Sequence, residues 1–176
     1  MSKAKLPIDF LLQIQYNCYK CYYLYLRGIM EKIVIGCDHA AVQMKNNVIN
    51  HLKAQGYDVI DVGTYSEESC DYPDYAYAAA KKVADGEVAK GILICGTGIG
   101  MSIAANKVKG IRCALCDNLF SAEMTRRHND SNMLAMGARV ISNQLALEIV
   151  DMFLQTPFEG DRHQRRIDKV MAIEKE

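Results

Sequence analysis

The sequence predicts an α/β domain built on a parallel sheet of five strands. From Met30 onward, short apolar runs rich in β-branched residues alternate with helical patterns, which is the arrangement of successive βαβ units. A length of 176 residues with 50% apolar residues suits one domain that buries its own core. These observations predict the chain order βαβαβαβαβα and no second globular domain.

The strands are predicted at the apolar runs and the helices at the stretches of helical period between them. The predicted strands are Lys32–Cys37, Tyr57–Val62, Gly91–Cys95, Ile111–Cys116 and Met133–Met136. The predicted helices lie near residues 40–54, 74–85, 98–107, 118–128 and 142–154. A docked tail helix is predicted after Pro157, because apolar residues recur there at helical spacing.

Residues typical of helix ends support the predicted bounds of the helices. Gly56, Gly86 and Gly110 each follow a helical run, where a left-handed residue closes a helix. Asn118 and Ser142 stand where side-chain caps of helix N-termini are expected.

Composition excludes several classes of partner. Lys and Arg number 21, as do Asp and Glu, so no overall positive field favours nucleic acid or an anionic membrane. The apolar stretch Ile8–Ile14 is interrupted by Asp9 and Gln13 and resembles neither a membrane span nor a secretion signal. The seven Cys residues form no even disulfide framework, which predicts free thiols and a cytoplasmic location.

Residues 1–29 differ in composition from the rest of the chain. The run from Tyr16 to Tyr25 is rich in tyrosine, whereas Met30 directly precedes the first predicted strand. We predict an N-terminal extension over 1–29, with Met30 as the native start, and a single domain over 30–176.

Reactive side chains gather at the ends of the first and third predicted strands. The first strand runs into Cys37-Asp38-His39, and the third runs into Cys95-Gly-Thr-Gly-Ile-Gly100 before a helix. Ligands of open parallel sheets bind beyond the carboxyl ends of the strands. Glycines let a ligand approach the backbone amides, and a helix start favours a thiolate over a thiol. We predict an oxyanion site here, with Cys95 as a base or nucleophile.

Two basic segments are expected to converge on the same pocket. Arg126-Arg127-His128-Asn129-Asp130 closes the fourth helix, and the tail carries Arg162, Arg165 and Arg166. A spacing of four puts Arg162 and Arg166 on one helix face, where they could clamp a phosphate. The alternatives are a solvated helix end and an ordinary basic face.

Each motif also has an ordinary structural explanation. A glycine-rich turn joins many strands to helices, and this one lacks the G-x-G-x-x-G spacing of dinucleotide binders. A single free Cys is often a small buried apolar residue. Cys113 and Cys116 suggest zinc together with Cys18 and Cys21, but residues three apart on a strand point to opposite faces. We therefore predict no metal.

Seven motifs spread over the domain carry a family resemblance. They are Gly36-Cys-Asp-His-Ala40, Asp71-Tyr-Pro-Asp74, Ile94-Cys-Gly-Thr-Gly-Ile-Gly100, Ser102-Ile-Ala-Ala-Asn-Lys107, Arg127-His-Asn-Asp130, Gly137-Ala-Arg139 and Gly160-Asp-Arg-His-Gln164. Through them the segment from Met30 resembles the B-type ribose 5-phosphate isomerases, relatives of galactose 6-phosphate isomerase. Residues 1–29 have no counterpart in this family pattern.

The resemblance implies a three-layer α/β/α sandwich on a five-stranded parallel Rossmann-like sheet. It implies an aldose–ketose isomerase that interconverts ribose 5-phosphate and ribulose 5-phosphate through a cis-enediolate, as in the non-oxidative pentose phosphate pathway. No cofactor is implied. The implied assembly is a homodimer or homotetramer with the active site at the subunit interface.

The resemblance also implies roles for individual residues. Cys95 would take the C2 proton, which places the chain in the cysteine-base branch, with Thr97 assisting. His128 would open the sugar ring, and Asp38 would handle hydroxyl protons. The implied substrate-binding residues are Gly96, Gly98 and Gly100 at the enediolate oxygen, His39, Arg162 and Arg166 at the phosphate, and Tyr72, Asn106, Asn129 and Arg139 elsewhere on the sugar.

Other functions fit the sequence less well. A low-molecular-weight phosphatase needs Arg where this chain has Met101, and a nucleotide sensor that uses Asp117 would need different glycine spacing. Among isomerase substrates, allose 6-phosphate and galactose 6-phosphate remain open beside ribose 5-phosphate, because one methylene-sized contact discriminates by only about 10–200-fold.

Overall fold

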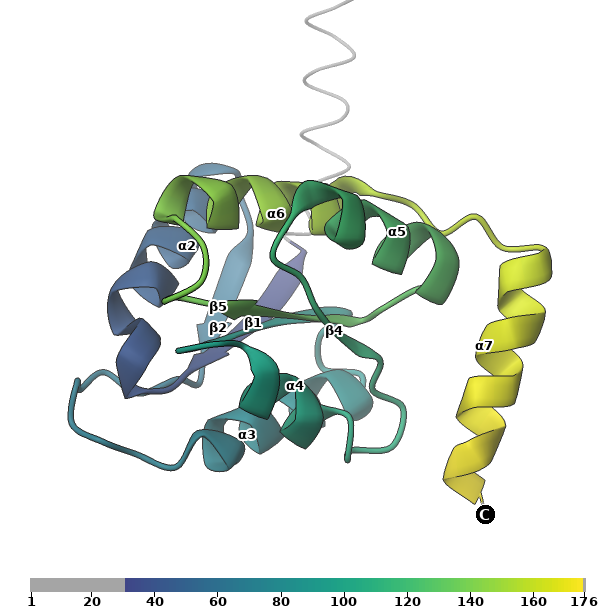
Figure 1. The fold of residues 1–176 in the computed structure, drawn as a ribbon, viewed down its shortest axis with the longest axis horizontal. Helices are drawn as coiled ribbons and strands as arrows, with labels where there is room; N and C mark the ends of the chain where they lie inside the picture. Colours follow the sequence, from purple (N-terminus) through teal and green to yellow (C-terminus); the bar gives the residue numbers. More distant parts are fainter. Residues whose placement is uncertain (1–30, 176) are drawn as a thin grey trace, which may run out of the picture. The chain divides into compact units, whose positions relative to one another are not determined.

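The computed structural model describes residues 31–175, and the predicted extension over 1–29 lies outside them. Five parallel strands form one sheet in the order β2-β1-β3-β5-β4 (Figure 1). They are β1 (Lys32–Cys37), β2 (Asp58–Asp61), β3 (Lys90–Cys95), β4 (Cys113–Leu115) and β5 (Met133–Gly137). The predicted five-stranded parallel sheet is confirmed.

Helices cover both faces of the sheet. They are α2 (Val42–Ala54), α3 (Tyr72–Ala84), α4 (Ile99–Ala105), α5 (Leu119–Asn129), α6 (Asn143–Gln155) and α7 (Arg162–Ala172), with short 3-10 turns at His39–Ala41 and Ile173–Lys175. Figure 1 shows α2, α5 and α6 on one face, α3 and α4 on the other, and α7 beside α5. The three-layer α/β/α sandwich is therefore confirmed.

Strand alternation supplies one apolar core to each face. In β1, Ile33 and Ile35 pack with α2 and α6, whereas Val34 between them packs with the alanine-rich side of α3. Both sets are fully buried, as expected for a parallel strand covered by helices on two sides. Cys116 lies in the first core and Cys113 packs against the second, which confirms that these two thiols face opposite ways.

The residues predicted to begin or end helices have the expected contacts and backbone conformations. Asn118 accepts a hydrogen bond from Ser121 N, and Ser142 accepts one from Leu145 N, so both cap their helices. Gly56, Gly86 and Gly110 have φ angles of 87°, 75° and 85°. These are left-handed conformations, which glycine adopts without a steric cost.

Three predicted elements are too long. The strand expected over Tyr57–Val62 spans only Asp58–Asp61, the residues that pair with β1. The helix expected over 98–107 spans only Ile99–Ala105, because Gly98 is left-handed and the Asn106 side chain turns to bond the backbone of Cys113. The strand expected over Ile111–Cys116 shrinks to Cys113–Leu115, since this edge strand pairs with β5 alone.

A buried cation anchors the loop that follows β2. The Lys45 side chain is fully buried, and its Nζ lies 2.8 Å from Asp61 Oδ2 and donates to Thr64 O at 2.9 Å. The ring of Tyr65 lies 4.2 Å from the same nitrogen. A buried charge is tolerated when it is paired and hydrogen-bonded, so Lys45 ties α2 to this loop.

None of the helices within residues 31–175 is long and apolar enough to span a membrane.

Candidate active site

The thiol predicted as a base lies beneath a loop of backbone amides at the carboxyl end of β3. We call residues 95–100 the thiol loop. Cys95 is 5% exposed, and Gly98 N donates to its sulfur at 3.0 Å. An N–H aimed at sulfur stabilises negative charge there, which is what a thiolate base requires.

Glycines allow the thiol loop to press against neighbouring backbone. Gly98 has a φ of 77°, and a Cβ at this position would lie 2.5 Å from Leu115 Cδ1 and 2.8 Å from the Met136 carbonyl carbon. A Cβ on Gly137 would likewise meet the Thr97 backbone at 2.7 Å. The thiol loop therefore packs closely against the end of β5 and leaves no room for a side chain at Gly98 or Gly137.

Two predicted substrate contacts lie against the same loop. A Cβ on Gly100 would meet Tyr72 Cζ at 2.7 Å, so the tyrosine ring packs directly on this glycine. Arg139 N donates to Gly96 O at 3.0 Å, and the Arg139 side chain lies beside Gly96. The structure thus brings Tyr72 and Arg139 to the thiol loop from α3 and from the residues after β5.

The end of β1 brings Asp38 and His39 next to β3. Asp38 N donates to Ile94 O at 3.2 Å, and the Asp38 carboxylate accepts from Ala40 N at 2.9 Å. His39 Nδ1 accepts a hydrogen bond from Cys70 N at 3.3 Å. A neutral His39 therefore carries its proton on Nε2, where it can be donated to an anion.

Three other thiols are poor candidates for a base. Burial raises the pKa of Cys37 and of Cys113 to about 12 and that of Cys116 to about 11. At neutral pH these groups remain thiols, and none of them is held under an amide loop. Cys95 differs from these three thiols because Gly98 N donates to its sulfur, and the structure favours it over them for the proposed chemistry.

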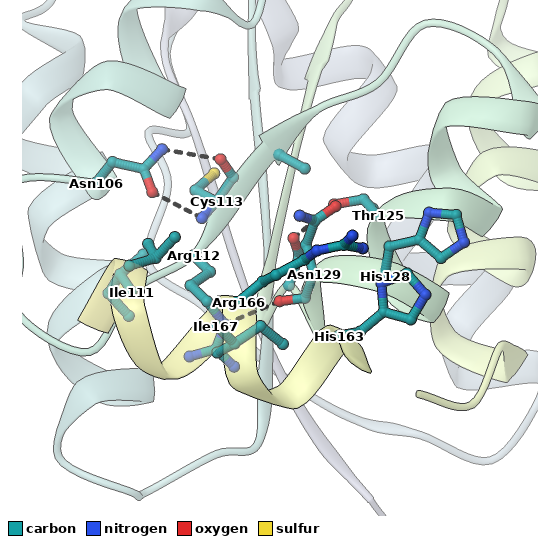
Figure 2. Close-up of a pocket in the computed structure, with 13 residues that line it drawn as sticks. Asn106, Ile111, Arg112, Cys113, Thr125, His128, Asn129, His163, Arg166 and Ile167 are labelled. Carbon is teal, nitrogen blue, oxygen red and sulfur yellow. Dashed lines mark hydrogen bonds between the residues drawn. The ribbon is translucent and has the colours of Figure 1, made fainter. Parts of the chain in front are cut away.

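A second group of predicted residues lines a basic hollow between α5, β4 and α7. We call this hollow the histidine pocket; it contains His128, Asn129, His163 and Arg166 (Figure 2). The His128 and His163 rings stack with their centroids 4.3 Å apart and their planes within 4°. Arg162 and Arg166 are exposed on α7 and have no ion-pair partner within residues 31–175.

Asn106 also lines the histidine pocket, but its side chain is already engaged. Its amide nitrogen donates to Ser102 O and Cys113 O, both at 2.8 Å, and its oxygen accepts from Cys113 N at 2.8 Å. These bonds join the end of α4 to the start of β4. A substrate contact by Asn106 stays a prediction, and its observed contacts are structural.

The expectation that all these groups converge on one pocket is wrong within a single chain. Cys95 pairs with Gly137 at the carboxyl ends of β3 and β5, whereas His128 precedes the amino end of β5. The five residues of β5 separate these two edges by four steps of about 3.3 Å, or about 13 Å. The reason is topological, because α5 returns across the sheet and delivers its C-terminus to the opposite edge.

The structure adds two residues that the sequence reasoning did not assign. His163 is buried, and Glu159 presents Oε2 to it and to His128. Desolvation lowers the pKa of His163, and the nearby positive charges of Arg162 and Arg166 act in the same direction. Their place in the sequence could have pointed to Glu159 and His163, since both residues lie within four positions of Arg162.

A parallel α/β sheet that holds a thiol under an amide loop at one edge and a basic hollow at the other defines an α/β enzyme of anionic substrates. The family model described as Ribose/Galactose Isomerase matches residues 33–170, and the chain belongs to this family.

Named relatives agree with this assignment. The chain is 52% identical to "Ribose-5-phosphate isomerase B" of Escherichia coli (strain K12) over 145 residues, which are 82% of this chain and 97% of the relative. The solved ribose-5-phosphate isomerase B of Clostridium thermocellum is similar with a TM-score of 0.81 and 52% identity, over 82% of this chain and 97% of that one. The enzyme of Mycoplasma genitalium, solved with bound ribulose-5-phosphate, has a TM-score of 0.80 and 43% identity over the same shares.

Proposed function

We propose that this chain interconverts ribose 5-phosphate and ribulose 5-phosphate. The observation that carries the proposal is the Cys95 sulfur held 3.0 Å from Gly98 N, next to Ile94, whose carbonyl accepts a hydrogen bond from Asp38 N. Similarity to proteins named ribose-5-phosphate isomerase B over most of the chain supports the choice of substrate.

The reaction moves one proton between adjacent carbons of the open-chain sugar. The Cys95 thiolate takes the proton from C2 of the aldose, and the electron pair of that bond forms the C1–C2 double bond of a cis-enediolate. As this double bond forms, the π pair of the aldehyde carbonyl moves onto O1. Asp38 then carries the hydroxyl proton from O2 to O1, and return of the first proton to C1 forms the ketose and regenerates the thiolate. Amides of the thiol loop donate to the developing oxyanion, and one such donor is typically worth about 10²–10³ in rate. Thr97 is exposed on the same loop and assists.

The remaining predicted roles divide between the two groups of residues. At the thiol loop, His39 Nε2 binds the phosphate, Asp38 exchanges hydroxyl protons, and Tyr72 and Arg139 contact the sugar. In the histidine pocket, His128 opens the ring. Asn129 and Asn106 hold the sugar there, and Arg162 and Arg166 clamp the phosphate.

These two groups act on one substrate only if two copies of the chain meet. Because a single chain keeps them at opposite edges of the sheet, we propose a homodimer in which the thiol loop of one copy faces the histidine pocket of the other. The surface beside the loop supports an interface. Its exposed apolar side chains are Ile99, Ile103, Leu115, Phe120 and Val140, exposed by 51%, 57%, 42%, 71% and 57%. A homotetramer would pair two such dimers.

The setting and domain organisation complete the proposal. The described cysteines are free, and a thiolate base needs a reducing compartment, which favours the cytoplasm. The family model begins at residue 33, which supports a catalytic domain over 30–176 and a dispensable extension over 1–29. The proposed chemistry uses no cofactor, so activity should persist in EDTA.

A coupled assay with ribose 5-phosphate, allose 6-phosphate and galactose 6-phosphate tests the proposed function. We expect the largest kcat/KM with ribose 5-phosphate. A larger value with either hexose phosphate would reassign the substrate. Hydrolysis of phosphate without isomerisation would point to the phosphatase, although the buried Met101 occupies the position where that chemistry needs an arginine.

A further inference from the structure

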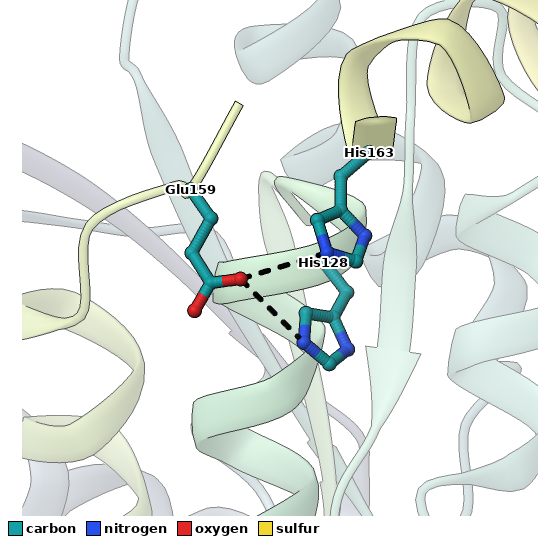
Figure 3. Close-up of side chains that lie close together, drawn as sticks. All are labelled: His128, Glu159 and His163. Carbon is teal, nitrogen blue, oxygen red and sulfur yellow. Dashed lines mark ion pairs between the residues drawn. The ribbon is translucent and has the colours of Figure 1, made fainter. Parts of the chain in front are cut away.

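Three side chains with metal-binding atoms meet at the edge of the histidine pocket. Glu159 Oε2 lies 3.8 Å from His128 Nε2 and 3.5 Å from His163 Nε2, as Figure 3 shows. One ligand atom from each residue falls within 4.8 Å of the other two. Two imidazoles and one carboxylate form the ligand set that catalytic zinc sites use, which leaves a fourth position open.

The spacing fits coordination better than hydrogen bonding. Charge-assisted N–H···O bonds are about 2.7–2.9 Å long, and both nitrogen–oxygen distances here are longer. In a tetrahedral site with metal–ligand bonds of about 2.0–2.2 Å, neighbouring ligand atoms are separated by about 3.3–3.5 Å. The Glu159–His163 separation of 3.5 Å already matches this spacing, whereas the Glu159–His128 separation of 3.8 Å is longer. The rings are parallel within 4°, so binding an ion requires the His128 ring to turn toward the other two ligands.

We propose that His128, Glu159 and His163 bind a divalent transition-metal ion of the zinc type. Imidazole nitrogen and a single carboxylate oxygen suit Zn²⁺, Co²⁺ and Ni²⁺ rather than Mg²⁺ or Ca²⁺, which prefer oxygen ligands.

Neighbouring charges are compatible with a bound ion. Arg127 Nε holds Glu159 Oε1 at 2.8 Å, which orients the carboxylate and leaves Oε2 for the metal. Glu123 pairs with the same arginine at 2.8 Å and offsets its charge. Arg162 Nε approaches His163 Nε2 at 3.4 Å, so this exposed side chain must swing away when an ion binds.

Metal binding has a consequence for catalysis that rests on the proposed function. An ion on Nε2 engages the His128 side chain that is proposed to open the sugar ring, and it displaces Arg162 from the phosphate clamp. The metal is therefore an inhibitor that competes with the sugar phosphate. The site gives the enzyme sensitivity to zinc although its own chemistry needs none.

Calorimetric titration of the full chain with Zn²⁺ tests the site directly. Glu159→Gln keeps the size of an exposed side chain and removes the charge, and His163→Gln removes a second ligand. Each variant should bind at least about tenfold more weakly at this site, as expected when a metal ligand is lost. The wild type and the variants keep every cysteine, so Zn²⁺ bound by thiols contributes equally to each titration.

His51→Gln is the matched control. His51 is also half-buried and pairs with a carboxylate, Asp151, at 2.8 Å, but it has no second histidine. The His51→Gln variant should bind Zn²⁺ with the affinity of the wild type. Equal affinity of the wild type and Glu159→Gln would overturn the proposal, and that exposed substitution decides the question if His163→Gln fails to fold.

Kinetics separate the metal site from the proposed function. Zn²⁺ should raise the KM for ribose 5-phosphate without changing kcat, EDTA should reverse the effect, and Glu159→Gln should need at least about tenfold more zinc. Binding that depends on Glu159 without any inhibition would uphold the metal site and remove His128 from the reaction. Calorimetry decides the metal site even if the chain isomerises a different sugar.

Discussion

Replacement of Gly98 by alanine tests whether the shape of the thiol loop is needed for catalysis. The residue is left-handed, with a φ of 77°, and its N–H donates to the Cys95 sulfur. A new Cβ would meet Leu115 at 2.5 Å and the Met136 backbone at 2.8 Å. The loop must therefore move, and it carries the amide away from the thiol.

Two effects contribute to the loss of stability expected for Gly98→Ala. A left-handed alanine costs about 1–2 kcal/mol by itself, and overpacking of a filled site adds about 1–3 kcal/mol. Gly98→Ala should therefore lower the free energy of unfolding by about 2–5 kcal/mol, which is a fall of about 4–20 °C in Tm for a chain of this size. Gly56→Ala is the matched control, since its φ is 87° and no atom lies within 4 Å of the new Cβ.

Urea unfolding and the coupled isomerase assay measure both effects. Gly56→Ala should lose about 1–2 kcal/mol and keep its kcat. In Gly98→Ala, displacement of the loop should lower kcat by about 10²–10³, because the thiolate loses the Gly98 N–H and the other loop amides move away from the developing oxyanion. Equal losses of stability in the two variants would refute the steric argument, and a native kcat in Gly98→Ala would remove the amide from the reaction.

Three further predictions concern single side chains. Cys95→Ser should fold and bind substrate but isomerise at least about 10²-fold more slowly, and turnover at the wild-type rate would sink the assignment of the base. Arg166→Ala should raise the KM for ribose 5-phosphate by about 10–100-fold because charge-assisted bonds are lost, whereas Arg165→Ala, on another face of α7, should change it little. Equal effects of the two would indicate only a diffuse positive field, which added salt would mimic. Lys45→Met should lower the free energy of unfolding by about 3 kcal/mol, since it leaves the Asp61 carboxylate without its cation. Unfolding at the same urea concentration as the wild type would contradict the proposed stabilising role of Lys45.

The sequence predicted the fold where local and tertiary preferences agree. The first strand has the predicted bounds, Lys32–Cys37, because every one of its apolar residues is covered by a helix layer. The prediction overextended β4, since Ile111 and Cys116 are apolar like the strand but the ladder with β5 pairs only Cys113–Leu115. Periodicity reports how apolar a residue is and does not report whether a neighbouring strand reaches it.

The candidate site was predicted in part for a similar reason. The glycine spacing and the strand end located the thiol loop, and the structure places Tyr72 and Arg139 on it. The sequence reasoning also expected His128 in the same pocket, which a single chain does not allow. Proximity of this kind depends on the direction in which α5 crosses the sheet. The pairing of Glu159 with two histidines depends on the path of the loop before α7, which no motif spacing encodes.

Complementation between two inactive variants tests the central claim, that the thiol of one copy works with the histidine of another. Cys95→Ser and His128→Ala chains, co-expressed with different affinity tags, yield mixed dimers that can be purified over both tags. In a site shared between subunits, each mixed dimer regains one intact site of its two, so the purified heterodimer should show about half the wild-type activity. If each active site lay within one chain, every chain of the mixed dimer would carry a defect. The heterodimer would then be as inactive as its parents, and that result would contradict the account.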